Sequence, residues 1–297
     1  MKKVVKFVGW TLAALVAVAL IGAAAAHLLA ERKRERTIDV QVAPIGYVND
    51  PASLARGKYM FESRGCSECH GADGAGKLFI DEPNGMRVWS PNISPGPGSV
   101  VAKYTEADWV RALRHGVKPD KRPMLIMPCE DYNRLTDADV AAVVAYVRSL
   151  PPVKGEGARF ELPLIVKALY AGDIVPDAPQ RIDHSLPPAQ PVAEGPTPEH
   201  GAYVANMCKG CHGDRLAGGP IPGSPPDWPP AADLTARATY ATYDSVDKFR
   251  AMLKSGKRPG GEKIRVMPFP SLAALSDTDV EALYAYLKTL PKGTDAQ

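Results

Sequence analysis

The sequence predicts an all-α protein in which one N-terminal transmembrane helix precedes two copies of the same small helical domain. Residues 7–26 form an uncharged apolar run, and the rest of the 297-residue chain contains an internal repeat with a period of about 141 residues. No segment shows a convincing alternation of apolar and polar residues, the pattern that marks a half-buried strand. We therefore expect essentially no sheet.

The N-terminal segment, residues 1–36, has the composition of a membrane anchor. Three lysines precede the twenty uncharged residues from Phe7 to Ala26, and a charged cluster follows from Glu31 to Arg36. Twenty apolar residues are about what a helix needs to cross a bilayer. A cleaved signal peptide, with a cleavage site at Ala23 to Ala26, is the alternative, although its apolar region is usually shorter. On either interpretation the body is exported. We expect a single-pass protein of the inner (cytoplasmic) membrane, with its body in the periplasm or outside.

Charge is divided unevenly along the chain. Residues 1–36 contain seven Lys and Arg against two Asp and Glu, a net charge of +5, whereas residues 37–297 contain 29 against 31, a net charge of −2. The basic charge therefore belongs to the membrane segment. Because the body has no basic face of the kind that binds a polyanion, we expect no nucleic-acid partner.

Four of the five cysteines lie in two identical patterns, Cys66-Ser67-Glu68-Cys69-His70 and Cys208-Lys209-Gly210-Cys211-His212. Cys-x-x-Cys-His is the attachment pattern for c-type haem. Two thiols three positions apart lie on one side of a helical turn, where they can add to the two vinyl groups of one porphyrin, and the adjacent His can reach the iron. A thioredoxin-like site would need a βαβ setting, and a structural zinc site would need four ligands. The motifs therefore predict two covalently attached haem c groups.

The repeat continues downstream of each motif. Amphipathic segments at 108–116 and 248–256 both end in Gly, which is typical of a helix C-terminus. A capped helix then begins in each copy at Thr136 or Ser276, and from 135 to 151 the first copy is identical to the second at nine of seventeen positions.

Each copy also begins alike. Asp50-Pro51 and Thr197-Pro198 have the pattern of an N-cap followed by proline in the first helical turn. Gly57 and Gly201 follow, and we expect them to let the first helix of each copy cross the last one closely, near Tyr146 or Tyr286. The predicted domains are 51–153 and 197–292. The linker between them, 154–196, is rich in Pro and Gly and contains one apolar stretch, 162–171, that predicts a short helix. Packing against a domain is the expected role of this helix, with a membrane-surface helix as the alternative.

Methionine is the expected second axial ligand of each iron. Met127-Pro128 and Met267-Pro268 lie eleven residues after the Gly of each copy, and a thioether opposite the His gives six-coordinate iron with a raised potential. Met124 is a rival in the first copy, but its counterpart in the second is Ile264.

The order of haem motif, amphipathic helix, Met-Pro and capped terminal helix resembles class I cytochrome c. The duplicated form, with a membrane segment and Leu-Ala-Arg-Gly-Lys-Tyr at 54–59, resembles bacterial membrane-anchored dihaem cytochromes c. Those proteins are related to the cytochrome subunits of periplasmic alcohol and gluconate dehydrogenases. The resemblance implies two tandem class I cytochrome c-like domains and electron carriage. It also implies thioether bonds and axial pairs at named positions: thioethers from Cys66, Cys69, Cys208 and Cys211, and the pairs His70/Met127 and His212/Met267.

The same resemblance implies a support for each axial His. Class I cytochromes place a Pro-Asn-Leu segment so that the Pro carbonyl accepts a hydrogen bond from that His. Pro91-Asn92-Ile93-Ser94 is similar, and Ala232-Asp233-Leu234-Thr235 lies at the matching place. The alternative for both segments is an Asx turn.

These features predict a membrane-tethered periplasmic electron-transfer protein rather than an enzyme. It would relay electrons between a dehydrogenase or quinol-oxidising enzyme and a terminal acceptor such as an oxidase. The alternatives are a dihaem peroxidase, which needs an open distal site, and a sulfur-oxidising cytochrome with a thiolate ligand. Cys129 alone supports the latter, and we expect it to be a buried thiol. His115, His184 and His200 are expected to be surface or capping residues.

Overall fold

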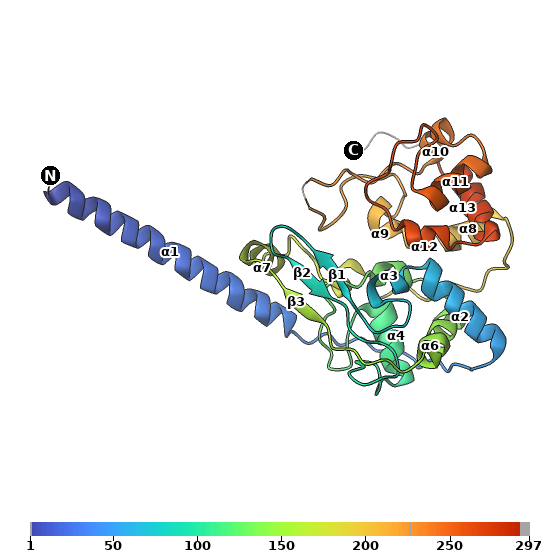
Figure 1. Ribbon diagram of the computed structural model, residues 1–297, viewed down its shortest axis with the longest axis horizontal. Coiled ribbons are helices and arrows are strands. Elements are labelled where there is room, and N and C mark those ends of the chain that lie inside the picture. The colour runs from blue at the N-terminus through green and yellow to red at the C-terminus, as the bar shows by residue number, and fades with distance from the viewer. Residues whose placement is uncertain (1, 226, 292–297) are drawn as a thin grey trace.

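The computed structural model describes residues 2–225 and 227–291, and consists of a long N-terminal helix attached to two helical lobes (Figure 1). Residue 1 of the predicted anchor and residue 292 of the second predicted domain lie outside the described residues. Helix α1 (Lys2–Arg34) projects from the first lobe, and its apolar side chains are exposed almost throughout. It is the one helix in the described part of the chain that is long and apolar enough to cross a membrane.

The first lobe is built from five helices and three short strands: α2 (Pro51–Ser63), α3 (Cys66–His70), β1 (Leu78–Asp81), β2 (Arg87–Trp89), α4 (Glu106–His115), α5 (Cys129–Tyr132), α6 (Asp137–Ser149) and β3 (Arg159–Glu161). Two short helices follow along its surface: α7 (Leu164–Ala171) and the 3-10 helix η1 (Ala178–Arg181). The second lobe repeats the helical plan: α8 (Pro198–Val204), η2 (Ala205–Cys208), α9 (Lys209–His212), α10 (Ala236–Thr242), α11 (Val246–Ser255), α12 (Phe269–Ala273) and α13 (Asp277–Thr289).

The helices begin and end where the capping signals predict. The side chains of Thr136 and Ser276 each accept a hydrogen bond at 3.1 Å, from the backbone N–H of the aspartate three residues on. Gly116 and Gly256 end α4 and α11 in the left-handed conformation, with φ of 64° and 69°. Only glycine adopts this conformation without strain, so both helix ends are fixed by the local sequence.

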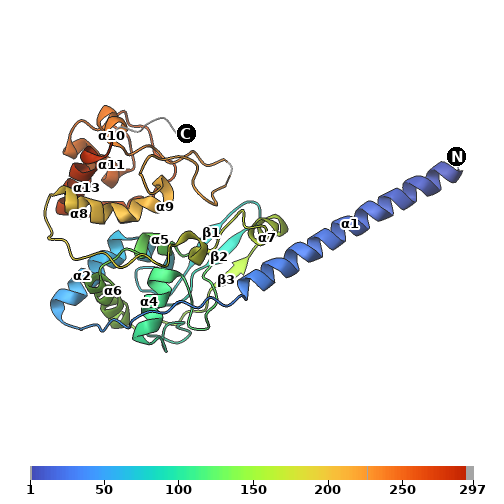
Figure 2. The ribbon, with the colours of Figure 1, turned by 180° about the vertical axis from the view of Figure 1, so that it is seen from behind.

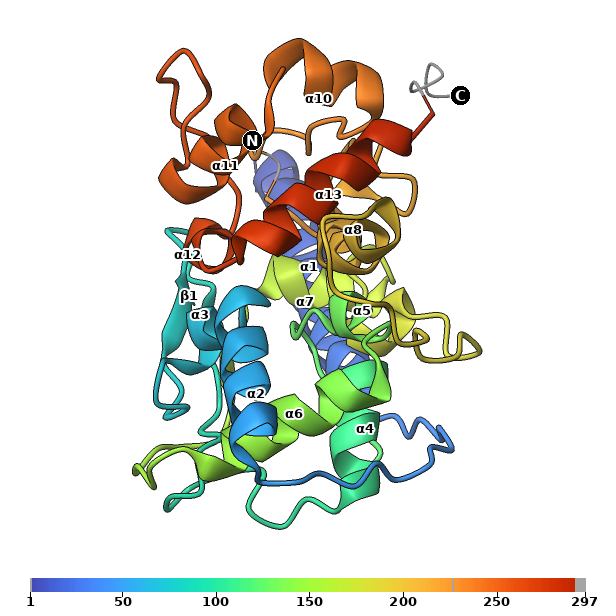
Figure 3. The same ribbon diagram turned by 90° about the vertical axis from the view of Figure 1, so that its right-hand side faces the viewer.

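In each lobe the first helix crosses the last one at a glycine, as the sequence predicts. A Cβ atom on Gly57 would lie 2.0 Å from the carbonyl oxygen of Ala142 in α6, and one on Gly201 would lie 1.9 Å from that of Ala282 in α13. These distances are far below van der Waals contact. The absence of a side chain therefore allows α2 to pack on α6 and α8 to pack on α13 (Figure 3).

Each lobe has its own hydrophobic core. Met60, Phe61 and Trp109 lie in the first, with side chains of α6; Phe249 and Leu283 lie in the second, with side chains of α8 and α12. Burial of these groups is the main favourable contribution to folding of each lobe.

The expectation of essentially no sheet was wrong in one place, although the fold is all-α in class. Strands β1, β2 and β3 form an antiparallel three-stranded sheet in that order. The strands have three or four residues, and only Val88 of β2 is buried. Such strands are too short to show an alternating pattern in the sequence. Strand β3 comes from the predicted linker, which therefore packs against the first lobe.

Candidate functional site at the junction of the two lobes

Each Cys-x-x-Cys-His motif forms a single helical turn. Helix α3 runs from Cys66 to His70, and in the second lobe the turn spans the end of η2 and α9. No cysteine is paired with another as a disulfide, so both thiols of each motif remain for a different bond. Burial raises the pKa of Cys66 to about 12, that of Cys69 to about 11 and that of Cys208 to about 12. The unmodified thiols are therefore neutral.

The imidazoles that follow the thiols are held by backbone carbonyls. His70 Nδ1 lies 3.0 Å from the carbonyl oxygen of Pro91, and His212 Nδ1 lies 2.7 Å from that of Ala232. A carbonyl only accepts, so Nδ1 carries the proton and Nε2 is left with a lone pair. Burial lowers the pKa of both histidines, which keeps the rings neutral. Both are thus prepared to donate Nε2 to a metal.

The segments that supply these carbonyls also form the Asx turns that were the alternative interpretation. Asn92 Oδ1 accepts from Ser94 N at 2.8 Å, and Asp233 Oδ1 accepts from Thr235 N at 2.7 Å. The two interpretations are compatible, because the turn orients the carbonyl of the residue before it. Asn92 is also buried, and its amide donates to the carbonyl of Val153 at 3.0 Å, which joins this segment to the chain just after α6.

The two predicted thioether residues occupy equivalent turns. The carbonyl of Met127 accepts from Cys129 N at 2.8 Å, and that of Met267 accepts from Phe269 N at 2.9 Å. Met127 is half-buried against the first core together with Cys66, and Met267 against the second core together with Cys208.

The rival methionine has a different setting. Met124 N donates to the carbonyl of Gly116 at 2.7 Å, and Ile264 N donates to that of Gly256 at 2.9 Å. Met124 and Ile264 are therefore structural counterparts, as the repeat predicts. The repeated geometry favours Met127 and Met267, which occupy equivalent turns, as the two axial thioether ligands.

Each lobe thus has two thiols and one imidazole with a free Nε2 in its motif, and packs the first of these cysteines and one methionine against one apolar core. Nowhere in residues 2–225 and 227–291 do three or more His, Cys, Asp or Glu side chains converge in a way that could hold a bare metal ion. A porphyrin-bound iron needs only axial ligands from the protein, and the thiols supply covalent attachment. The residues present therefore fit haem c.

Each motif packs against the other lobe at a pseudo-two-fold interface. Helix α5 of the first lobe contacts η2 and α9 of the second, while α12 of the second contacts α2 and α3 of the first (Figures 2 and 3). Asp131 of α5 accepts from Gly210 N at 3.1 Å, inside the second motif. Reciprocally, Ser271 N of α12 donates to Glu68 at 3.0 Å, inside the first motif. Asp131 and Ser271 are counterparts in the repeat, as are Glu68 and Gly210.

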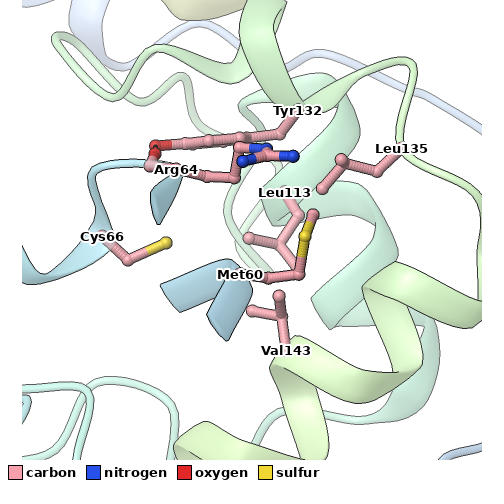
Figure 4. A pocket seen from close by; sticks show the side chains of 7 residues that line it. All are labelled: Met60, Arg64, Cys66, Leu113, Tyr132, Leu135 and Val143. Carbon is pink, nitrogen blue, oxygen red and sulfur yellow. Dashed lines mark hydrogen bonds between the residues drawn. The ribbon is translucent and has the colours of Figure 1, made fainter. Parts of the chain in front are cut away.

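A buried arginine lies between the two motifs. The Arg64 side chain is 5% exposed and its Nη2 lies 3.0 Å from Asp279 Oδ2 of the other lobe. Tyr132 donates to the Arg64 carbonyl at 2.9 Å. Arg64, Tyr132 and Cys66 line one small cavity, and the Cys66 thiol points into it (Figure 4). Burial dominates the raised pKa of Cys66 and of Cys208, but the Arg64 charge lowers both. Arg64 is therefore close to both motifs.

Sequence reasoning missed this interface. Asp139 and Asp279 lie in the capped first turns of α6 and α13, and no contact between the lobes was expected for them or for Tyr59 and Tyr203. The available signal was their recurrence at equivalent positions of both copies.

Two histidines were also wrongly assigned to the surface or to capping. His200 is 2% exposed, with Nε2 3.3 Å from Asp279 Oδ1, and His115 is buried and stacks on the exposed His184. Interlobe and linker packing bury these two rings, and local sequence does not encode that packing.

Cys129 is a buried thiol, as expected. It is fully buried and its Sγ donates to the carbonyl of Ala112 at 3.3 Å. Burial raises its pKa far above the usual range, so it remains neutral. A neutral buried thiol gives no support to a thiolate-ligated catalytic site.

Comparison with known proteins agrees with the geometry. The family model for cytochrome c matches residues 54–151 and 199–291. Among curated proteins, the fructose dehydrogenase cytochrome subunit of Gluconobacter japonicus is 30% identical over 80% of this chain and 53% of its own length. The cytochrome c subunit of alcohol dehydrogenase (quinone) from Gluconobacter oxydans is 28% identical over 95% of this chain and 60% of its own length. A diheme cytochrome c-type of Cereibacter sphaeroides is 29% identical over 80% of this chain and 86% of its own length. The chain thus spans little more than half the length of the two dehydrogenase subunits.

Proposed function

Because the chain belongs to the cytochrome c family, we propose that it is a membrane-tethered electron carrier that passes electrons between its two haems across the interface of the lobes. It binds haem c covalently and transfers electrons rather than acting as a catalytic subunit. Haem supplies an iron that alternates between the ferric and ferrous states. The protein attaches it, orients the axial ligands and sets its potential.

The residues take the following roles in this proposal. The cysteines attach one haem to each lobe, through Cys66 and Cys69 and through Cys208 and Cys211. His70 and Met127 ligate the first iron, and His212 and Met267 ligate the second. The carbonyls of Pro91 and Ala232 hold the Nδ1 protons, so that each ring keeps Nε2 toward the iron. As ligands, the thioethers of Met127 and Met267 would favour the ferrous state of the iron.

The reciprocal packing of each motif on the other lobe carries this proposal. Asp131 binds within the second motif and Glu68 of the first motif binds α12, so both attachment turns lie at one junction. Two carriers held in fixed proximity exchange electrons without a diffusional encounter. A peroxidase would instead need one lobe with an open distal position, whereas both lobes place a methionine in the same turn.

The proposed location is the inner membrane, with α1 as a single-pass anchor and both lobes in the periplasm. The proposed donor is a dehydrogenase or a quinol-oxidising enzyme, and the acceptor is a terminal oxidase. Two relatives that are dehydrogenase cytochrome subunits support the first of these partners.

The test is purification of the full chain from membranes in mild detergent. We expect the intact mass to include two haems, low-spin spectra in both oxidation states, and the weak absorption band of an iron–methionine bond in the oxidised protein. High-spin iron with turnover of peroxide would establish the peroxidase instead. Recovery with a bound dehydrogenase would identify the donor.

A further inference from the structure

Helix α7 is bound to the end of α1 by hydrogen bonds and by contacts between charged and aromatic side chains. Lys33 Nζ donates to the carbonyl of Tyr170 and to Asp173, both at 2.6 Å, and lies over the Tyr170 ring. Arg36 Nη2 donates to Asp177 Oδ1 at 2.8 Å, and the Tyr170 hydroxyl donates to Asp177 Oδ2 at 2.9 Å. Asp177 is fully buried, so this pairing holds Arg36, two residues after the end of α1, against the first lobe.

The outer face of this assembly is apolar. Leu164 and Ile165 of α7 are 48% and 63% exposed, and Ile174, just after the helix, is 68% exposed. The helix contains no acidic residue, and its single charge is Lys167. Isolated exposed aliphatic side chains are ordinary, but here three of them lie on or directly after a helix that packs against α1.

The position of α7 along α1 matches the boundary of the bilayer. The uncharged run of α1 ends at Ala26, and Lys167 Nζ lies 3.1 Å from Nδ1 of His27, the next residue. Leu28 and Leu29 of α1 are exposed at the same level. Figure 1 shows α7 at the side of the first lobe from which α1 runs toward the N-terminus. Lysine at this depth can extend its ammonium to the lipid headgroups while its stem stays in apolar surroundings.

We propose that α7 is an interfacial helix, lying in the headgroup region of the periplasmic leaflet with Ile165 and Ile174 in contact with lipid. The proposal rests on α1 as the membrane anchor. The apolar face of α7 continues that of α1 at the level where the span ends, and a lipid surface is the occupant that fits both. The first lobe is then held against the membrane in one orientation instead of swinging on a flexible tether.

The chain permits a site-specific test by spin labelling. Four cysteines are occupied by haem in the holoprotein and Cys129 is fully buried, so an added surface cysteine is the only reactive thiol. The variants are Ile165→Cys and Ile174→Cys, with Leu186→Cys as a matched control. Leu186 is 45% exposed in an irregular segment, and the carbonyl of the next residue, Pro187, accepts from Arg134 between α5 and α6. Each labelled full-chain holoprotein is reconstituted in vesicles of phosphatidylethanolamine and phosphatidylglycerol. Collisions with oxygen, which concentrates in lipid, are compared with those of a water-soluble nickel chelate.

The expected result is that labels at 165 and 174 collide more with oxygen than with the chelate, and that the label at 186 does the opposite. Labels at all three positions in water would overturn the proposal while α1 still anchors the chain. Labels shielded from both agents would indicate coverage by protein and would overturn it as well. An intact mass lacking α1 would remove the anchor and this inference together, and membrane fractionation separates that failure from the others.

Discussion

The hydroxyl of Tyr59 in the first lobe donates to Asp279 Oδ2 in the second at 2.6 Å, and Tyr203 of the second donates to Asp139 of the first. Tyr203 also accepts from Thr136 N at 3.2 Å, as Tyr59 accepts from Ser276 N at 3.2 Å. Each lobe thus uses the equivalent residues to bind the other lobe, as the two subunits of a symmetric dimer do, but within one chain. The repeat therefore builds both lobes and the interface between them.

Replacing either tyrosine by phenylalanine should weaken the interface. Tyr59→Phe and Tyr203→Phe each remove a donor from a buried carboxylate, at a cost of about 1–3 kcal/mol. Both aspartates keep an arginine partner, Arg64 or Arg56, so folding should survive. Chemical unfolding followed at the haem bands measures the loss. Equal stability of both variants and the native chain would contradict a structural role for the reciprocal contacts.

A methyl group at the helix crossings should be strongly destabilising. Gly57→Ala and Gly201→Ala place a Cβ about 2 Å from a backbone oxygen, so the helices must separate. Overpacking of this kind costs about 1–3 kcal/mol or more. Gly260→Ala is the control, because a Cβ added at Gly260 would meet nothing within 4 Å beyond its own chain neighbours. Thermal unfolding should show a lower Tm for the two crossing variants and little change for the control.

Asp139 should contribute a pH-dependent part of the stability. Burial alone would raise its pKa, but hydrogen bonds and the charge of Arg56 outweigh burial and lower it. The folded pKa is thus below the unfolded value of about 3.9, so the stabilisation is present above that pH and is lost as the pH falls through the folded pKa. Asp139→Asn should be less stable at neutral pH and should show a smaller loss in acid. Unfolding free energies measured between neutral pH and acid check this sign.

Removing the buried arginine should affect both haems. Arg64→Met leaves Asp279 with His200 as its remaining basic partner, and breaking a buried pair costs about 3–5 kcal/mol. Because Arg64 is close to Cys66 and Cys208, loss of its positive charge should lower both reduction potentials. A redox titration measures them. Arg87→Met is the control, since Arg87 lies on the exposed sheet. A shift of only one potential would show that Arg64 serves a single haem.

The axial ligands can be tested by exchange of methionine for histidine. Met127→His and Met267→His should each keep a low-spin haem, since the cysteines still attach it, but should lower the potential of that haem only. Met124→His serves as the control in the same turn region and should change neither potential. If Met124→His lowers one potential and Met127→His changes none, Met124 is the first-lobe ligand.

Local sequence alone determined the longer helices, their caps and the candidate haem residues. Capping by Thr136 and the left-handed glycine at 116 depend on neighbours within a few residues, and the spacing from Cys66 to His70 is itself the attachment chemistry. The carbonyl partner of His70 was implied by the resemblance to class I cytochrome c, and the close crossing at Gly57 could be predicted because the repeat displayed the same pattern twice.

The tertiary structure decided those features that depend on contacts between residues far apart in the sequence. Strand β3 forms only because residues 159–161 return to pair with β2, which no local periodicity records. His200 is buried because the second lobe brings Asp279 to it and packs against the first, and Arg64 lies between the motifs for the same reason. The sequence determined two separate candidate haem sites, since each consists of residues that are linked by one motif and one repeat. Their mutual orientation was decided only by folding, because it depends on hydrogen bonds between residues more than sixty positions apart.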